Sequence, residues 1–240
     1  MKTKNLLVFI AAVTLSLSAM AENAEANIKK ILQQRMGDGA VIETVAKTPY
    51  GGLYEVKIGS ELVYTDAEAK FVFIGRVVDA ETSKDYTQAR LDEINRIKFS
   101  DLPLEAALKT VKGNGKRVIA VFEDPNCGYC KRFRKTLNET KDITVYTFMY
   151  NILSDDSRVK SKNVWCSADR SKAWDEWMLN AKVPATAAES CAVTPNEKVL
   201  ELGRKLKVSG TPTIFFADGS RVPGAVDAKT LEAKLASLNK

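Results

Sequence analysis

Two cysteines separated by two residues are the part of this sequence best suited to carry chemistry. Cys127-Gly128-Tyr129-Cys130 follows an apolar run, residues 118–122, and opens a helix-like segment. The amides and the macrodipole at a helix N-terminus favour an anion, so we expect the first thiol to ionise readily. A thiolate is the nucleophile of disulfide exchange. The spacing and its context therefore predict a redox-active dithiol.

The chain has four cysteines, and the other two are Cys166 and Cys191. Four cysteines allow three connectivities. The adjacency within the C-x-x-C motif favours Cys127 with Cys130 and Cys166 with Cys191, which would make the second pair structural. An all-cysteine zinc site stays open as an alternative, although the sequence has no second C-x-x-C motif.

Composition excludes several classes of protein. The sequence contains no histidine, which removes Ser-His-Asp and Cys-His catalysis and every zinc set that includes histidine. The formal charge is only +6 and no long Lys/Arg block occurs, so we expect no nucleic-acid binding. We interpret the basic residues that open the helix as a solvated face that also favours a nearby thiolate. These residues are Lys131, Arg132, Arg134 and Lys135.

Residues 1–21 are typical of a cleaved export signal. Lys2 and Lys4 supply positive charge, residues 6–17 are mostly apolar, and Ala19-Met20-Ala21 is a small-x-small cleavage site. We expect a mature chain that begins at Glu22 in the periplasm, where disulfides persist. No later segment approaches about 20 uninterrupted apolar residues, so we expect no membrane insertion. An uncleaved anchor remains the alternative.

The first part of the mature chain, residues 22–83, predicts a small α+β domain. Apolar side chains recur at helical spacing over residues 28–36. Four strand-like segments follow, over residues 41–46, 53–58, 61–65 and 71–78. Such a domain buries little surface and leaves an edge strand unpaired, so we expect it to form a homodimer.

Residues 84–102 are interpreted as a linker helix, since Leu91, Ile94 and Ile97 recur at helical intervals. Residues 103–240 predict an α/β domain that contains an insertion with three tryptophans, interpreted as core residues. Residues 102–115 fit either a helix or a shorter element. The expected order is a strand, the C-x-x-C motif, a helix to about Thr140, strand 143–150, insertion 154–207, strand 213–216 and helix 228–238.

A second motif, Gly210-Thr211-Pro212-Thr213, stands directly before a predicted strand. Together with the C-x-x-C it resembles the thioredoxin superfamily, in which this proline is cis and faces the cysteines. The export signal, the small N-terminal domain, the Gly128-Tyr129 dipeptide and the Trp165-Cys166 and Ser190-Cys191 pair extend the resemblance to the periplasmic disulfide isomerases of the DsbC family. The resemblance covers the whole mature chain. It implies a C-terminal thioredoxin-like domain with a helical insertion and an N-terminal α+β dimerisation domain.

The resemblance also implies residue roles and partners. Cys127 would be the attacking thiol, Cys130 the resolving thiol, and Cys166 with Cys191 a buried structural disulfide. Residues that bind the substrate would be Gly128, Tyr129, Thr211 and Pro212. The implied partners are misoxidised or unfolded exported proteins and an inner-membrane thiol reductase of the DsbD type, with no cofactor and no metal. Three other readings stay open: a dithiol oxidase, a non-enzymatic chaperone and the zinc module.

One position departs from thioredoxin itself. Thioredoxins carry a buried acid six residues before the first cysteine, and Val121 stands there in this chain. Glu123 and Asp124 lie nearer to Cys127, where a carboxylate would oppose ionisation of the thiol. Asp124 also fits a simple turn residue before Pro125-Asn126.

Overall fold

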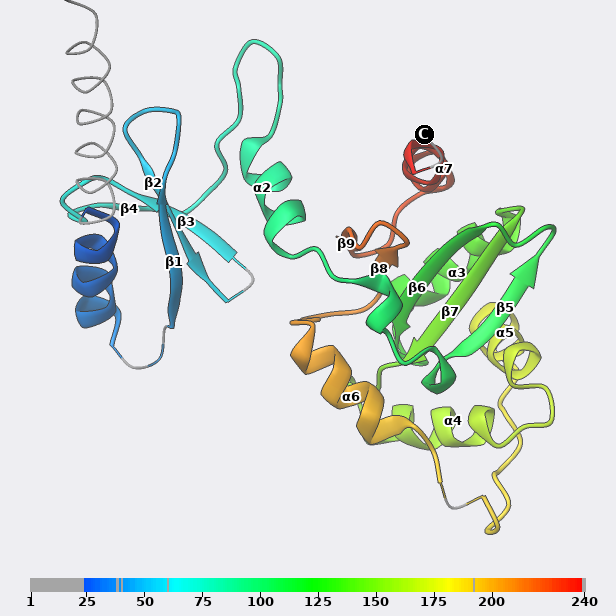
Figure 1. Cartoon of the computed structure of the whole chain (residues 1–240). Coiled ribbons are helices and arrows are strands. Elements are labelled where there is room, and N and C mark those ends of the chain that lie inside the picture. The colour runs from blue at the N-terminus through cyan, green and yellow to red at the C-terminus, as the bar shows by residue number, and fades with distance from the viewer. Residues whose placement is uncertain (1–23, 38, 40, 60, 192, 239–240) are drawn as a thin grey trace, which may run out of the picture. The chain divides into compact units, whose positions relative to one another are not determined.

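The computed structural model describes residues 24–238, apart from residues 38, 40, 60 and 192. The export signal expected over residues 1–21 lies outside the described residues. The chain divides into two compact units, one ending at Ile94 and the other beginning at Asn95 (Figure 1). Within the described part of the chain, no helix combines the length and the apolarity needed to cross a bilayer.

The first unit is a four-stranded antiparallel sheet with a helix on one face. The helix covers residues 24–36, and its Ile28 and Leu32 pack against Val45 and Val56 of the sheet. These side chains are buried because apolar residues recur at helical spacing on the helix and alternate along the strands. The strands are β1 (Ile42–Lys47), β2 (Tyr54–Ile58), β3 (Glu61–Thr65) and β4 (Val72–Phe73), in that order.

Two elements of this unit are shorter than predicted. The strand expected over residues 71–78 is only β4, because Gly75 turns the chain at a φ of 157°. The next residues pair elsewhere, and the amide of Tyr86 donates to the carbonyl oxygen of Val77 at 2.9 Å. The linker helix expected within residues 84–102 is the shorter α2 (Tyr86–Ile94). It ends there because the following backbone joins the second unit, where the amide of Ile97 donates to the carbonyl oxygen of Gly219 at 2.9 Å.

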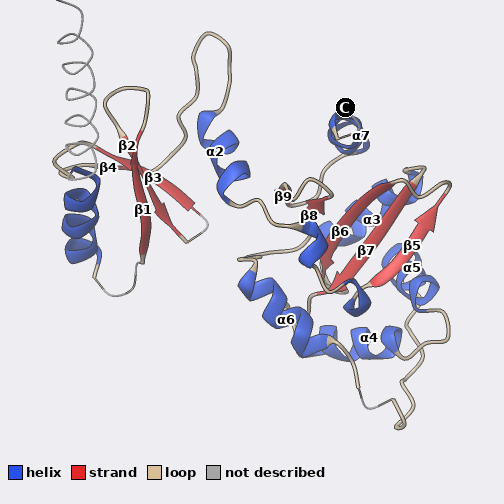
Figure 2. Cartoon of the chain, in the orientation of Figure 1, coloured by secondary structure: helices blue, strands red, loops and turns tan. Residues whose placement is uncertain are grey.

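The second unit is built on a five-stranded mixed sheet of order β5-β7-β6-β8-β9 (Figure 2). Only β6 and β7 are parallel, and the other pairs are antiparallel. Residues 102–115, which the sequence left open between two readings, form a 3-10 turn (Leu104–Ala106) and β5. The short edge strand β9 was not predicted. The strands are β5 (Leu108–Lys112), β6 (Arg117–Glu123), β7 (Ile143–Met149), β8 (Thr213–Phe216) and β9 (Arg221–Pro223).

Helices cover both faces of this sheet (Figure 1). Alternation along β6 sends Ile119 and Val121 into a core with α3 and α7, while Ala120 and Phe122 enter a core with α6. The helices are α3 (Gly128–Glu139), α4 (Asp155–Trp165), α5 (Arg170–Asn180), α6 (Asn196–Lys205) and α7 (Ala228–Ser237). This two-faced packing fixes the end of β6 and the start of α3, and the C-x-x-C motif forms the N-cap and first turn of α3.

Candidate active site

Cys127 occupies the N-cap position of α3. Its backbone amide donates to the carbonyl oxygen of Asp124 at 3.1 Å, and its sulfur accepts a hydrogen bond from the amide of Cys130 at 3.2 Å. An N–H donor directed at sulfur, at the positive end of a helix, stabilises negative charge on that atom. Both thiols are free, with Cys127 5% exposed and Cys130 fully buried. Cys127 is therefore the thiol of this pair that solvent reaches.

The loop before β8 faces this sulfur. The antiparallel pairing of β6 with β8 places Thr213 opposite Phe122, which brings Thr211 beside the C-x-x-C motif across 84 residues of sequence. The Cys127 thiol donates to the carbonyl oxygen of Thr211 at 3.3 Å. The Thr211–Pro212 peptide bond is cis. The two motifs singled out in the sequence thus meet at one end of the sheet.

Cys130 has a very different environment. It is fully buried in a cluster with Met149, Val164 and Trp174. Burial raises the pKa of the Cys130 thiol, and the negative charge of Glu123 raises it further. Cys130 therefore needs a proton acceptor before it can act as a nucleophile at neutral pH.

Glu123, the last residue of β6, is also fully buried. Burial raises the pKa of its carboxyl to about 7, and the positive charge of Arg134 opposes that rise. One carboxylate oxygen, Oε2, accepts a hydrogen bond from the indole nitrogen of Trp174 at 3.2 Å and lies 3.6 Å from Nη1 of Arg134. Its other oxygen, Oε1, has no hydrogen-bond partner among the residues that the structure describes.

The interpretation of the helix-opening basic residues as a solvated face was wrong for Arg134. Its side chain is only 3% exposed, since it lies on the face of α3 that also buries Cys130, Phe133 and Leu137. Nε of Arg134 donates to Oδ1 of Asp175 at 2.6 Å. A position four residues after Cys130 falls on the same helix face, and this spacing was a signal in the sequence.

Asp124 is buried, and its carboxylate links the loop before Cys127 to the loop and first turn of α4. Its Oδ1 accepts from the amide of Asn126 at 2.8 Å and from the hydroxyl of Ser157 at 2.7 Å. Its Oδ2 accepts from the amides of Ile152 and Leu153 at 2.9 and 3.0 Å. The bond to Asn126 fits the turn residue that the sequence indicated. The other three bonds give Asp124 a wider role, because they hold two loops together.

Apolar side chains stand exposed in the first turn of α3 and on the loop between β7 and α4. Tyr129 is 62% exposed within the C-x-x-C motif, and Ile152 and Leu153 are 40% and 55% exposed. The tryptophans behave differently from them, because Trp174 is fully buried and Trp177 donates its indole N–H to the carbonyl oxygen of Pro125 at 2.7 Å. The solvent-facing apolar side chains at this end of the domain therefore come from the first turn of α3 and from the loop before α4.

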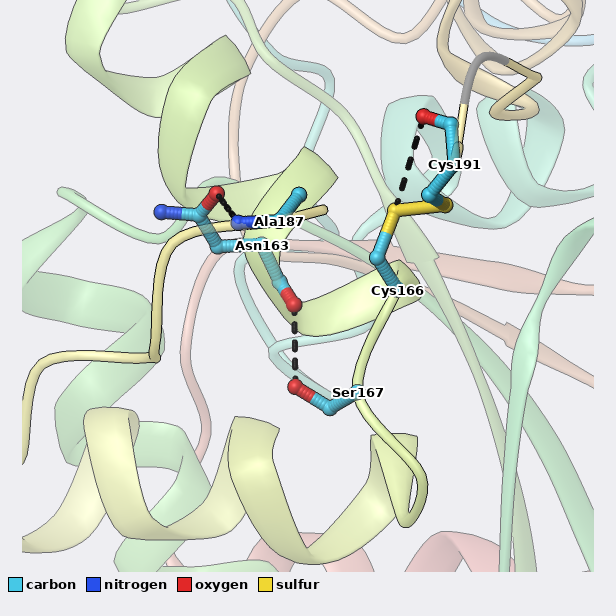
Figure 3. The surroundings of a disulfide bond; sticks show 5 residues. All are labelled: Asn163, Cys166, Ser167, Ala187 and Cys191. Atoms are coloured by element: carbon cyan, nitrogen blue, oxygen red, sulfur yellow. Dashed lines mark hydrogen bonds between the residues drawn. A yellow bond between two sulfur atoms is a disulfide. The ribbon is translucent and has the colours of Figure 1, made fainter. Parts of the chain in front are cut away.

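The second cysteine pair is bonded, but both cysteines are only half-buried, whereas the resemblance implied a buried disulfide. A disulfide joins Cys166, at the end of α4, to Cys191 in the segment between α5 and α6 (Figure 3). A nearby contact fastens the same segment, since the amide of Ala187 donates to Oδ1 of Asn163 at 2.9 Å. The hydroxyl of Ser167 donates to the backbone carbonyl of Asn163 at 2.9 Å. The disulfide and the Ala187 bond attach the segment between α5 and α6 to α4, whereas the Ser167 bond is local to the end of α4.

The disulfide also bears on the zinc alternative. Two of the four cysteines are used in it, and no group of three or more His, Cys, Asp or Glu residues in the described part of the chain lies together so as to hold a metal ion. The donor set for a four-cysteine zinc site is therefore not assembled.

A dithiol at the N-terminus of a helix that follows a central strand, facing a cis-proline loop, defines the C-terminal unit as a thioredoxin-like domain. In agreement, the family described as "Thioredoxin-like domain" matches residues 104–239, and the family described as "Disulfide bond isomerase protein N-terminal domain" matches residues 19–88. The chain belongs to the DsbC family.

Similar proteins span most of the chain. The probable thiol:disulfide interchange protein DsbC of Bordetella parapertussis is 47% identical over 91% of this chain and 77% of its own length. Thiol:disulfide interchange protein DsbC of Escherichia coli K12 is 28% identical over 90% of each chain. A crystal structure of a disulfide interchange protein from Neisseria gonorrhoeae is 36% identical and has a TM-score of 0.54. That match covers 57% of this chain and 97% of the other.

Proposed function

We propose that this protein is a thiol:disulfide interchange enzyme that rearranges incorrect disulfides in exported proteins of the periplasm. The observation that carries the proposal is the position of Cys127, a free thiol at the N-cap of α3 whose sulfur receives the amide of Cys130. Family membership supports it, because the relatives that span the chain bear the name thiol:disulfide interchange protein.

In the proposed reaction the Cys127 thiolate attacks one sulfur of a substrate disulfide. A bond forms between the Cys127 sulfur and that substrate sulfur, the substrate S–S bond breaks, and the other substrate sulfur leaves as a thiolate. A second substrate thiol then attacks the mixed disulfide, forms a new bridge and releases Cys127. No net oxidation or reduction occurs, which is isomerisation.

Cys130 supplies the escape when rearrangement stalls. Its sulfur attacks the Cys127 sulfur, so that the substrate leaves with two thiols and the enzyme keeps a Cys127–Cys130 disulfide. Two electrons have then passed to the substrate. A membrane thiol reductase of the DsbD type would return two electrons to the enzyme and restore the dithiol.

Residues around Cys127 would bind the extended substrate chain. Thr211 places a backbone carbonyl 3.3 Å from the Cys127 sulfur, and Tyr129 is 62% exposed. Gly128 and Pro212 complete the proposed binding set on either side of the thiol. An extended peptide paired with the backbone at Thr211 would present a disulfide sulfur to Cys127.

Chaperone-like binding of unfolded chains belongs to the same proposal. Ile152 and Leu153 add exposed apolar surface on the neighbouring loop, and such surface binds non-native segments. The double variant Cys127→Ser/Cys130→Ser should still suppress aggregation of a cysteine-free client in a light-scattering assay. Loss of that suppression in the folded double variant would contradict this part of the proposal.

We also propose that the first unit forms a homodimer through β4. Among the described residues, β4 pairs only with β3 and leaves its other edge open. Exposed apolar side chains line this segment: Phe71, Val72, Phe73 and Ile74. An apolar unpaired edge favours pairing with a second copy. Ile74→Asp should give the monomer mass in analytical ultracentrifugation, whereas Val159→Asp, at an exposed site on α4, should leave the dimer intact.

Refolding of scrambled ribonuclease, with alkylation trapping of the mixed disulfide, tests the reaction and the nucleophile together. The wild-type protein should restore ribonuclease activity, Cys127→Ser should abolish the effect, and Cys130→Ser should accumulate a trapped Cys127 adduct. Recovery of activity with Cys127→Ser would overturn the assignment of the nucleophile. Oxidation of reduced ribonuclease without rearrangement of the scrambled form would indicate a dithiol oxidase instead.

A further inference from the structure

The Cys130 thiol needs a proton acceptor, and the acid that thioredoxins carry six residues before the first cysteine is absent from this chain. Val121, six residues before Cys127, carries no acid and packs in the core with Phe133 of α3. Side chains two positions apart on a strand point to the same face. Glu123 therefore lies on the same face of β6 as Val121, one step closer to the dithiol.

Glu123 and Cys130 share one buried environment. Trp174 packs in the same cluster as Cys130 and donates its indole N–H to Oε2 of Glu123. The carboxyl and the thiol interact electrostatically, since the charge of Glu123 disfavours ionisation of Cys130. Oε1 of Glu123 is buried and lacks a hydrogen-bond partner within the described residues. Burying a carboxylate oxygen without a hydrogen-bond donor costs free energy of folding. Such an oxygen, here Oε1 of Glu123, can accept a proton.

We propose that Glu123 accepts the proton of Cys130 when this thiol resolves the mixed disulfide on Cys127. The inference rests on the proposed function. In this step the Cys130 sulfur bonds to the Cys127 sulfur, the bond from Cys127 to the substrate sulfur breaks, and the substrate leaves as a thiolate. The Cys130 proton passes to Glu123 directly or through one water molecule, and later to solvent. The electron pair of the broken bond leaves with the substrate.

Charged groups from the neighbouring elements set the affinity of Glu123 for this proton. Arg134 of α3 faces the carboxylate at 3.6 Å and favours the ionised form. Asp175 of α5 holds the other side of the guanidinium and itself disfavours ionisation of Glu123. Lys112 of β5 interacts electrostatically with both Asp175 and Arg134. With a pKa of about 7, Glu123 exchanges protons near neutral pH.

The ionised carboxylate of Glu123 affects Cys130 both before and during its attack on the mixed disulfide. While Cys130 is a thiol, Glu123 raises the cost of a nearby thiolate, so the proton stays on sulfur until attack begins. During attack the proton moves to the carboxyl, and the total negative charge in the buried cluster does not increase. A single buried charge is less costly than two, which is the physical reason for the proposed coupling.

Stopped-flow reaction of the reduced, full-length protein with an aromatic nitrobenzoate disulfide separates the two thiols. The released thiolate absorbs visible light, so a first, concentration-dependent phase reports attack by Cys127. A second, concentration-independent phase reports attack by Cys130 on the mixed disulfide. The rate of each phase is measured between pH 5 and 9 for the wild type and for Glu123→Gln. Glutamine keeps the size of the side chain and an acceptor for Trp174, while Asp175 still pairs with Arg134.

We expect Glu123→Gln to slow the second phase at least about tenfold at pH 7.5, given that a positioned base contributes roughly 10²–10⁴-fold. The first phase should stay within about twofold. The wild-type second phase should rise with pH through an inflection near 7, and the variant should lose this inflection. Glu123→Asp should recover part of the rate. Glu139→Gln makes the same chemical change at an exposed site on α3 and should change neither phase.

The outcomes are distinguishable. Absence of the first phase in the wild type would refute the proposed function itself. A normal first phase with a second phase within twofold of wild type in Glu123→Gln, at every pH, would overturn only the role of Glu123. If Glu123→Gln does not fold, the wild-type profile decides, since a second phase without an inflection near pH 7 would overturn the inference.

Discussion

Replacement of Asp124 by asparagine tests whether one carboxylate holds the loop before Cys127 in place. Asp124 accepts four hydrogen bonds, two on Oδ1 from Asn126 and Ser157 and two on Oδ2 from Ile152 and Leu153. An asparagine has only one acceptor oxygen, so its NH₂ group must face one of these donor pairs. The less costly orientation turns the amide nitrogen toward Asn126 and Ser157, because the serine hydroxyl can rotate to accept.

The size of the effect follows from the bonds lost. Hydrogen bonds to charged groups contribute about 1.5–3 kcal/mol each, so loss of the bond from the Asn126 amide predicts a decrease of about 1.5–3 kcal/mol in the free energy of unfolding. Domain stabilities are typically about 5–15 kcal/mol, and the variant should therefore unfold at a lower urea concentration than the wild type. All three tryptophans lie in the second unit. Tryptophan fluorescence in a urea titration thus reports this unit alone.

Asp155→Asn provides a matched control. Asp155 is exposed in the first turn of α4, immediately beside the loop that Asp124 holds. Its replacement removes the same charge and should cost only about 0.3–1 kcal/mol, through the helix dipole. If Asp124→Asn lost no more stability than Asp155→Asn, with an unchanged urea dependence, the buried carboxylate would not be what joins the two loops.

Three further predictions follow from other contacts. Because the pKa of Glu123 is raised from 4.5 to about 7, its contribution to stability is full below pH 4.5 and is lost as pH rises to about 7. The loss of unfolding free energy is about 3 kcal/mol, at 1.36 kcal/mol per pKa unit. It should appear as the difference between wild-type and Glu123→Gln urea titrations across this pH range. An equal dependence of the free energy of unfolding on pH in the two proteins would contradict it. The double variant Cys166→Ala/Cys191→Ala opens a loop of 25 residues. It should lose about 3.5 kcal/mol in the chain-entropy account while Cys127 still reacts with iodoacetamide, and complete loss of that reaction in a folded variant would argue against a structural role. Gly203→Ala would place a methyl group 2.3 Å from Cε2 of Tyr150, so overpacking should cost about 1–3 kcal/mol in thermal unfolding, and an unchanged midpoint would refute it.

Local signals in the sequence were sufficient to predict much of the second unit. The strand before Cys127, the helix that begins at Gly128 and the strand that begins at Ile143 are all present. Each is specified by a contiguous pattern, either a run of apolar residues or apolar side chains at helical spacing. Edge strand β5 was left open between a helix and a shorter element, and edge strand β9 was not predicted. Strands of this length carry little pattern of their own and form by pairing with β7 and β8.

The buried charge network could not be predicted from local pattern. Glu123 and Arg134 are each ordinary surface residue types, and nothing in the sequence pairs them with each other or with Asp175. Their burial depends on how α3 and α5 pack on the end of β6. The position of Arg134 on the apolar face of α3 was visible as an i, i+4 spacing from Cys130. Its partners were visible only in three dimensions.

The open edge of β4 has a consequence for a protein that handles unfolded polypeptides. Extended chains add readily to an exposed strand edge, whatever their sequence. A client captured there would be held by the first unit, through an element that carries no thiol, and would be lost to productive exchange. A second copy seated on this edge would remove the competing trap, so self-association and fidelity of client handling would have the same structural origin. A fragment of residues 24–94 made alone at low concentration should accordingly bind extended peptides at β4, an edge that the second copy would cover in the intact dimer.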